Sequence, residues 1–267
     1  TLNPNRGAWL EYETDANDVF YVRIDKNRKI PMTVLLRAMG LGDDARIREF
    51  FGDDERVEAT IAKDPTKNQE EGLLETYRKL RPGEPPTIES ASNHLEGLFF
   101  DPRRYDLSRF GRYKMNKKLA IARRIMGHEA ARDIIAPLTG ELLCAAGEKI
   151  GTDLAWEIEK SGVSIVFLNV DDREVKVISN GTVNANDFFS FDTQELGINE
   201  RVSFEQVRAI LDETSDPEEQ KELIVKNRDK LISKTVTLDD IFSSINYLNC
   251  LAHGVGTTDD IDHLGNR

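Results

Sequence analysis

The stretch WLEYETDANDVFYVRI, residues 9–24, decides how the chain begins to fold. Polar and apolar residues alternate over residues 9–13 and again over 19–24, which is the period of a strand with one buried face. The Asp- and Asn-rich break at residues 15–18 supplies the residue types that form turns. These sixteen residues therefore predict a β-hairpin.

Helical patterns follow the hairpin. Apolar spacing and breakers predict five helices, at about residues 31–39, 43–51, 53–63, 67–80 and 87–99. Pro31 lies in the first turn of the first helix, and Thr87 is placed to cap the last. Residues 81–86 contain three prolines, which fix φ and remove donors, so we expect a rigid loop there.

The pattern changes after residue 127. Two further hairpins are predicted, at residues 134–145 and 163–179, with a short helix at 152–160. Helical signals then return, with caps at Ser203, Asp216 and Thr237. We expect an α+β fold that is mainly helical, with an N-terminal β-hairpin and a small inserted β-rich module. The expected divisions are residues 1–130, 131–195 and 196–267.

Composition narrows the class of protein. Of the 267 residues, 39% are hydrophobic and 31% charged, and the net charge is −12. These values suit a folded globular protein and exclude a disordered one. Because no stretch approaches the roughly 20 apolar residues of a spanning helix, and Cys144 and Cys250 lack any metal-ligand spacing, we expect a cytoplasmic protein. The start at Thr1 predicts a piece of something longer.

A basic segment interrupts this acidic chain. Residues 103–124 contain nine Lys and Arg residues opposed only by Asp106, with Tyr105, Phe110 and Tyr113 among them. Such clustering is typical of phosphate-backbone contact, and the aromatic rings could stack on bases. A solvated helix face is an equal alternative.

Two other features have competing interpretations. Asp259, Asp260 and Asp262 could hold Mg²⁺ as in a phosphohydrolase, but a turn in which the carboxylates bond backbone is favoured. Trp9 is expected in the core, although a Trp beside an Arg and a Gly can also form a stacking platform. No nucleophile or phosphate-loop motif is present.

Nine ordered strings carry a family resemblance. They are PNRGAWLE (4–11), VRID (22–25), RKIP (28–31), YRKLRPGEPPT (77–87), LFFD (98–101), RYDL (104–107), GRYKMNKKL (111–119), HGVG (253–256) and DDIDHLGNR (259–267). They resemble the lobe, or β2 domain, of the bacterial RNA polymerase β subunit. The resemblance is strong over residues 1–127 and 237–267 and looser between, where the β-rich module resembles a lineage-dependent insertion.

The resemblance implies a DNA-contacting role. The lobe forms one wall of the DNA cleft, and the position of Trp9 stacks on an unpaired non-template base. The position of Asp262 reads a neighbouring flipped guanine in a pocket that Arg267 completes. The full set of expected DNA-binding residues is Arg6, Trp9, Arg81, Arg104, Arg112, Lys114, Lys117, Lys118, Asp262 and Arg267.

The resemblance also implies partners and a cofactor. The chain would be one part of a nucleotidyltransferase and inactive alone, with no cofactor of its own and with Mg²⁺ in the partner β′ subunit. Partners would be the rest of β, the β′, α and ω subunits, σ factor, the non-template strand and the downstream DNA duplex, but no membrane. Two alternatives stay open: a stand-alone metal-dependent phosphohydrolase using Asp259, Asp260 and Asp262, or chiefly a docking surface for σ and regulators.

Overall fold

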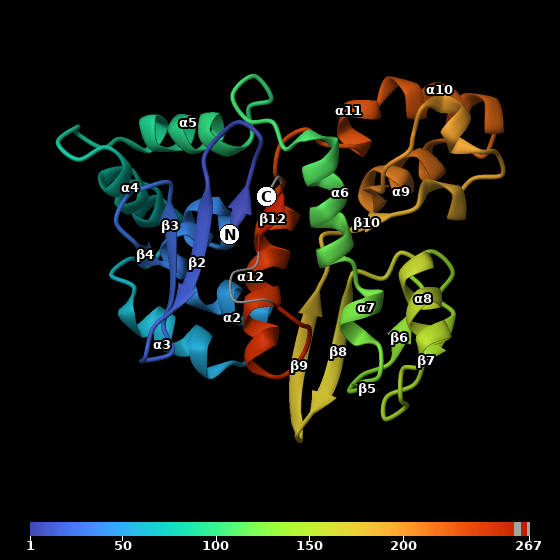
Figure 1. Ribbon diagram of the computed structural model, residues 1–267, viewed down its shortest axis with the longest axis horizontal. Coiled ribbons are helices and arrows are strands. Elements are labelled where there is room, and N and C mark those ends of the chain that lie inside the picture. Colours follow the sequence, from blue (N-terminus) through green and yellow to red (C-terminus); the bar gives the residue numbers. More distant parts are fainter. Residues whose placement is uncertain (259–262, 266–267) are drawn as a thin grey trace. The chain divides into compact units, whose positions relative to one another are not determined.

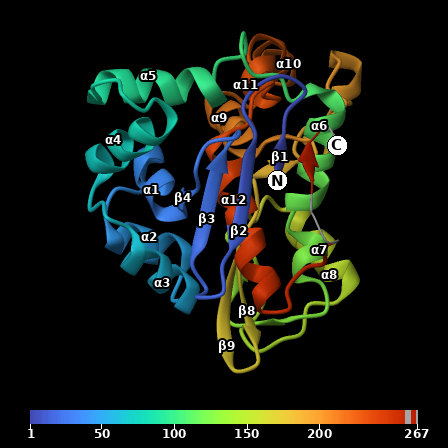
Figure 2. The same ribbon diagram turned by 60° about the vertical axis from the view of Figure 1, so that its left-hand side comes forward.

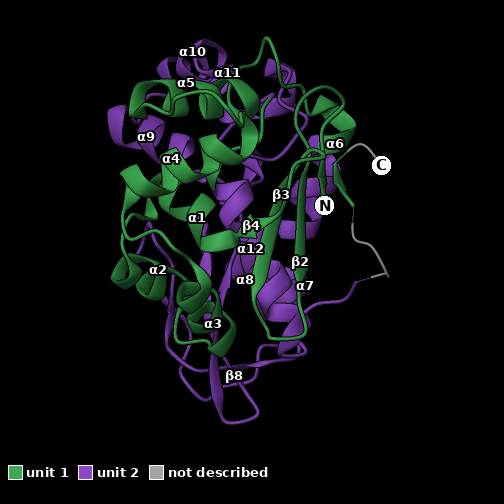
Figure 3. Cartoon of the chain, turned by 90° about the vertical axis from the view of Figure 1, so that its left-hand side faces the viewer, with its two compact units in different colours: residues 1–111, 235–238, 259–267 green, residues 112–234, 239–258 purple. Residues whose placement is uncertain are grey.

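The computed structural model describes residues 1–258 and 263–265, and it divides the chain into two compact units (Figures 1 and 3). Unit 1 contains residues 1–111, 235–238 and the C-terminal segment, and unit 2 contains residues 112–234 and 239–258. The α+β class is confirmed. No helix among the described residues is both long and apolar enough to cross a membrane.

Unit 1 is built on a five-stranded sheet in the order β12-β1-β2-β3-β4 (Figure 2). The predicted hairpin is confirmed as its centre, with Leu10 opposite Ile24 and Thr14 opposite Phe20. Asp15 shapes the turn, because its Oδ1 accepts from the backbone N–H groups of Asn17 and Val19. The strands are β1 (Leu2–Asn3), β2 (Leu10–Thr14), β3 (Phe20–Ile24), β4 (Ile30–Pro31) and β12 (Leu264–Gly265).

Five α-helices complete unit 1, and the predicted caps form. Thr87 accepts from the Ser90 N–H at 3.1 Å, as expected for an N-cap. The helices are α1 (Met32–Leu36), α2 (Asp44–Phe51), α3 (Glu55–Lys63), α4 (Gln69–Leu80) and α5 (Ile88–Phe99). Helix α6 (Ser108–Leu119) carries the chain from unit 1 into unit 2.

One local prediction needs correction. The helix expected at residues 31–39 is α1 followed by a π-helical turn, η1 (Arg37–Leu41). Arg37 is fully buried there, and its Nε donates to Asp64 at 2.9 Å while a second guanidinium nitrogen pairs with Asp44. A buried guanidinium must be paired, so these long-range carboxylates fix the turn.

Unit 2 has two apolar clusters, each with its own small sheets. One cluster packs under the sheet β5-β8-β9 and the hairpin β6-β7, around residues such as Ile158 and Leu168. The other surrounds Val202 and Val207 beside the pair β10-β11. The strands are β5 (Glu129–Ala130), β6 (Ile134–Ile135), β7 (Leu142–Cys144), β8 (Ile165–Val170), β9 (Arg173–Ile178), β10 (Thr182–Val183) and β11 (Val202–Ser203).

The helices of unit 2 follow the predicted signals. Ser203 accepts from the Gln206 N–H at 3.4 Å, and Asp216 likewise caps the helix after it. Both predicted hairpins of this unit are confirmed. The helices are α7 (Ala122–Ile125), α8 (Thr152–Lys160), α9 (Phe204–Glu213), α10 (Pro217–Lys226), α11 (Arg228–Leu231) and α12 (Leu238–Ala252).

Candidate nucleic-acid interface

Trp9 lies just before strand β2 and is half-buried rather than enclosed in the core. Its backbone is held firmly, because its N–H donates to Asp25 Oδ1 at 2.7 Å and its carbonyl accepts from the Asp25 N–H at 2.9 Å. The favoured core interpretation is therefore wrong for this residue. A fixed backbone with part of the indole open to solvent suits a stacking platform.

Gly7 explains why small residues precede Trp9. Its φ is +129°, a conformation that L side chains rarely adopt, and a Cβ there would lie 2.6 Å from the Tyr105 ring. Tyr105 itself is 1% exposed. Because Gly7 has no Cβ, the backbone just before β2 can pack directly against the buried ring of Tyr105.

The C-terminal segment joins the same sheet. Leu264 pairs with Leu2 in parallel register, and Leu2 pairs with Leu10 in the strand that follows Trp9. Gly265 has φ +125°, and a Cβ there would lie 2.0 Å from the Asn3 carbonyl oxygen. Only glycine fits this pairing.

Some predicted site residues fall outside the described part of the chain. These are Asp259, Asp260, Asp262 and Arg267. Their neighbour His263 is described, and its Nδ1 lies 3.3 Å from Asn3 Oδ1. Among residues 1–258 and 263–265, no group of three or more His, Cys, Asp or Glu side chains could hold a metal ion.

Arg6 is held against the loop that precedes α6. Its N–H donates to the Asp106 carbonyl at 3.1 Å, and its carbonyl accepts from the Asp106 N–H at 2.7 Å. The Arg6 side chain is exposed, with a guanidinium nitrogen 3.5 Å from the Pro102 carbonyl oxygen. This pairing brings Arg6 to the loop that carries Arg104.

Arg81 and Arg104 converge on a histidine that the sequence did not single out. Burial lowers the pKa of His94, and the positive charges of Arg81 and Arg104 lower it further, while Glu84 opposes them. Both arginines are exposed, and a guanidinium nitrogen of Arg81 lies 3.4 Å from a carboxylate oxygen of Glu84. Two of the predicted DNA contacts therefore lie near the same histidine, together with the Glu84 carboxylate.

The surroundings of His94 are ordered. Its ring packs edge-on against Tyr77 at 5.7 Å, and the Tyr77 hydroxyl donates to Glu84 at 2.7 Å. Arg104 lies over Gly97, where a Cβ would be 2.9 Å from its guanidinium. His94 and Gly97 are three residues apart on α5 and therefore share a face of the helix. This spacing is the one sequence signal that Arg104, which lies over Gly97, comes close to His94.

The basic segment is not one exposed face. As an expected DNA contact Arg112 should be exposed, but it is 4% exposed and its Nη1 lies 2.8 and 3.0 Å from the two carboxylate oxygens of Asp240. The expected exposure is wrong because a buried carboxylate far along the chain binds this guanidinium. Arg124 is also buried, and burial lowers its pKa.

The lysines of α6 are more accessible than Arg112. Lys117 is exposed, whereas Lys114 and Lys118 are half-buried. Lys118 donates to the Thr257 carbonyl at 3.1 Å and lies over the Tyr247 ring. Among the predicted residues, the structure places Arg6, Trp9, Arg81 and Arg104 in unit 1, and Arg112, Lys114, Lys117 and Lys118 in unit 2.

Comparison with known proteins gives a consistent result. The family model described as RNA polymerase Rpb2, domain 2, matches residues 1–153 and 188–267. DNA-directed RNA polymerase subunit beta of Clostridium botulinum (strain Okra / Type B1) is 55% identical over all 267 residues, and that of Clostridium acetobutylicum is 52% identical. The chain spans 22% of the length of these relatives.

Proposed function

The chain belongs to the RNA polymerase Rpb2 domain 2 family and is the lobe region of a bacterial β subunit, and from this we propose that it lines the DNA cleft and contacts the unpaired non-template strand. One observation carries the proposal. The sheet register runs from Leu264 through Leu2 to Leu10, so segments from opposite ends of the chain lie on neighbouring strands beside Trp9.

Trp9 supplies the stacking surface in this proposal. Trp9 is half-buried and its backbone is fixed by Asp25, so a base can stack without ordering a mobile loop. Stacking tolerates any base, because every base has a π-face.

Asp262 and Arg267 supply the base-specific part. A carboxylate accepts hydrogen bonds from the N–H edge of a flipped guanine, and a guanidinium suits phosphate or base acceptors. Both residues flank the segment 263–265, whose last two residues form β12. The pairing of β12 with β1 supports a site near Trp9.

The arginines of unit 1 position the strand. Arg6, Arg81 and Arg104 are exposed, and guanidinium groups bind phosphate without reading sequence. Lys114, Lys117 and Lys118 would add weak, salt-sensitive attraction. Arg112 is left out, because Asp240 binds its guanidinium.

The whole assembly supplies the remaining chemistry. We place Mg²⁺ and phosphodiester synthesis in the partner β′ subunit, so this chain has no catalytic step of its own. The partners are the rest of β, β′, α, ω and σ, with the non-template strand and downstream duplex as DNA ligands, in the cytoplasm.

The test compares variants in the reassembled polymerase. Asp262→Ala should cost about 1–3 kcal/mol for guanine at one non-template position and little for other bases, as for a lost base contact. Trp9→Ala should weaken binding at the adjacent position by about 1–3 kcal/mol, with little preference among large bases. Open-complex lifetimes on templates varied at both positions give these values.

Glu141→Ala is the matched control, because Glu141 is exposed in a loop of unit 2 and carries the same charge. It should leave the lifetimes unchanged. Nucleotide addition on a pre-opened scaffold should persist in every variant. A complete loss of nucleotide addition in Asp262→Ala would favour the phosphotransfer alternative instead.

A further inference from the structure

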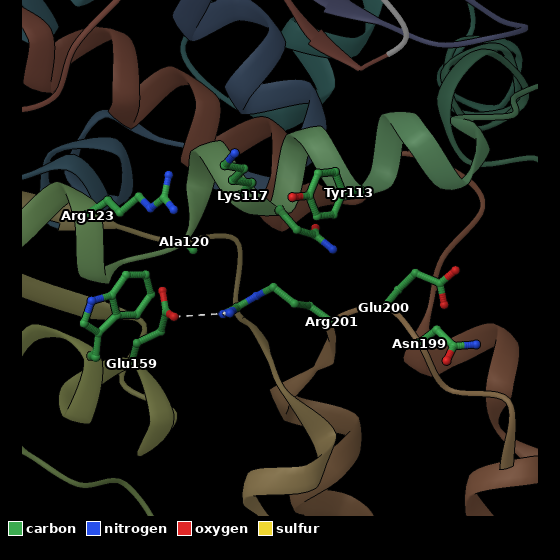
Figure 4. A pocket seen from close by; sticks show the side chains of 10 residues that line it. Tyr113, Lys117, Ala120, Arg123, Glu159, Asn199, Glu200 and Arg201 are labelled. Atoms are coloured by element: carbon green, nitrogen blue, oxygen red, sulfur yellow. Dashed lines mark hydrogen bonds and ion pairs between the residues drawn. The ribbon is translucent and has the colours of Figure 1, made fainter. Parts of the chain in front are cut away.

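Unit 2 contains a pocket of about 240 Å³ whose lining combines aromatic rings, cations, carboxylates and two side-chain amides (Figure 4). Tyr113 and Lys117 project into it from α6, and Glu200 and Arg201 form the opposite wall. All of its lining residues belong to unit 2, and none of them is among the residues assigned to the Trp9 site.

Two side chains of the pocket wall, Arg201 and Glu159, are held by hydrogen bonds within the fold. Arg201 donates to Glu159 at 3.2 Å and to the hydroxyl of Thr182 at 3.2 Å. Glu159 is 7% exposed and also accepts from the Ala122 N–H at 3.2 Å. These groups hold the wall in place and are not the groups that would recognise a charged ligand.

The side-chain amide nitrogen of Asn116 lacks a hydrogen-bond acceptor. It is 2% exposed and lines the pocket, and its Oδ1 accepts from Asn180 Nδ2 at 2.9 Å and from Arg112 at 3.4 Å. Its own Nδ2 has no hydrogen-bond partner. An unpaired buried donor is costly, and a ligand acceptor could satisfy this nitrogen only when the Asn116 side chain turns toward the pocket, because the atom itself is buried.

The two aromatic rings and the cations beside them suit a flat ring with a negative group, whereas the Glu200 carboxylate on the opposite wall disfavours an anion close to it. Trp156 lines the pocket and packs against the apolar cluster behind it, and Tyr113 is 59% exposed. The Arg123 guanidinium lies 5.9 Å from the Trp156 ring centre, and Lys117 lies 6.0 Å from that of Tyr113. Each aromatic face therefore has a cation within reach of a phosphate attached to a stacked ring.

We propose that this pocket binds a single unpaired nucleobase bearing a phosphate. The base would stack on Trp156 or Tyr113, with Lys117 and Arg123 binding the phosphate, and it would accept a hydrogen bond from Asn116 Nδ2 once that side chain turns toward the pocket. The volume lies below that of pockets for drug-sized ligands, which fits one base and not a larger cofactor. The base can come from a free mononucleotide or from single-stranded nucleic acid.

The binding test uses the fluorescence of the chain itself. The sequence contains two tryptophans, so Trp9→Phe leaves Trp156 as the reporter. Titration with dAMP and with a short oligo-dA should quench Trp156 saturably, and inorganic phosphate alone should not. Saturation by dAMP indicates a free mononucleotide as ligand, whereas saturation by oligo-dA alone indicates a strand.

Two exposed-residue variants in the same background locate the site. Tyr113→Ala should weaken binding about 5- to 150-fold, as for one lost base stack. Lys117→Ala with Arg123→Ala should weaken it roughly 2- to 30-fold. Far-UV circular dichroism checks that each variant folds.

The control removes one lysine and one arginine elsewhere in unit 2. Lys160 and Arg208 are exposed and do not line the pocket. Lys160→Ala with Arg208→Ala should leave dissociation constants unchanged. Equal weakening by both double variants would overturn the proposal in favour of general charge attraction. The proposal would also be overturned if neither dAMP nor oligo-dA quenched Trp156 saturably.

Discussion

The buried pair of Arg112 and Asp240 gives a quantitative prediction for the stability of unit 2. The two side chains are 5% and 1% exposed, and Asn180 Nδ2 also donates to Asp240 at 3.0 Å. Asp240→Ala removes the carboxylate but leaves a guanidinium in a place that water scarcely reaches. Breaking a buried pair in this way costs about 3–5 kcal/mol of the free energy of unfolding.

An exposed pair in the same unit serves as the control. Arg132 and Glu174 make two contacts at 2.6 and 3.1 Å, which is similar geometry, but their side chains are 57% and 43% exposed. Glu174→Ala should therefore cost only about 0.2–1 kcal/mol. The comparison isolates burial, because both variants delete one carboxylate from an arginine.

Urea unfolding followed by Trp156 fluorescence measures both values, in a Trp9→Phe background so that the signal comes from unit 2. Arg112→Met with Asp240→Leu should recover most of the loss, because it removes both charges from the interior. A cost for Asp240→Ala no larger than that for Glu174→Ala would refute the reasoning.

Two further predictions concern unit 1. Gly265→Ala should destabilise the pairing of β12 with β1 by about 1–3 kcal/mol, because the φ of Gly265 is +125° and a Cβ would strike the Asn3 carbonyl. Amide hydrogen exchange measures this effect, and unchanged protection at Leu2 and Asn3 would contradict the prediction. Burial lowers the pKa of His94, and the charges of Arg81 and Arg104 lower it further. Just below pH ~6.5 the unfolded chain therefore binds more protons than the folded chain, so the free energy of unfolding falls as the pH drops through that range. His94→Gln should flatten this decline in urea titrations at stepped pH, and a slope equal to that of the unchanged chain would count against it.

Local signals in the sequence predicted local structure well. The alternation around residues 15–18 gave the central hairpin, and Thr87 and Ser203 cap the helices they were expected to start. These elements depend on residues within a few positions of one another. Their physical cause is therefore legible in any short window of the sequence.

What the sequence could not show depends on distant partners. Arg112 looks like a DNA contact by composition, and only Asp240, on a helix formed much later in the chain, makes it structural. Arg37 turns the end of the first helix into a π-helical turn through Asp64 in the same way. His94 was missed because Arg81 and Arg104 approach it from outside its own helix.

The pairing of β1 with β12 also means that the sheet of unit 1 cannot be completed until late in the synthesis of this region. Leu264 is made some 260 residues after its parallel partner Leu2, so the edge of β1 stays unpaired while the intervening residues are synthesised. At ordinary ribosomal speeds this is roughly 13–50 s. During that time β2 can shield one side of β1 while the other offers unpaired backbone groups to any passing strand. Until residue 264 emerges, this short edge can pair wrongly with another strand, and a chaperone that covers it would prevent such misassembly.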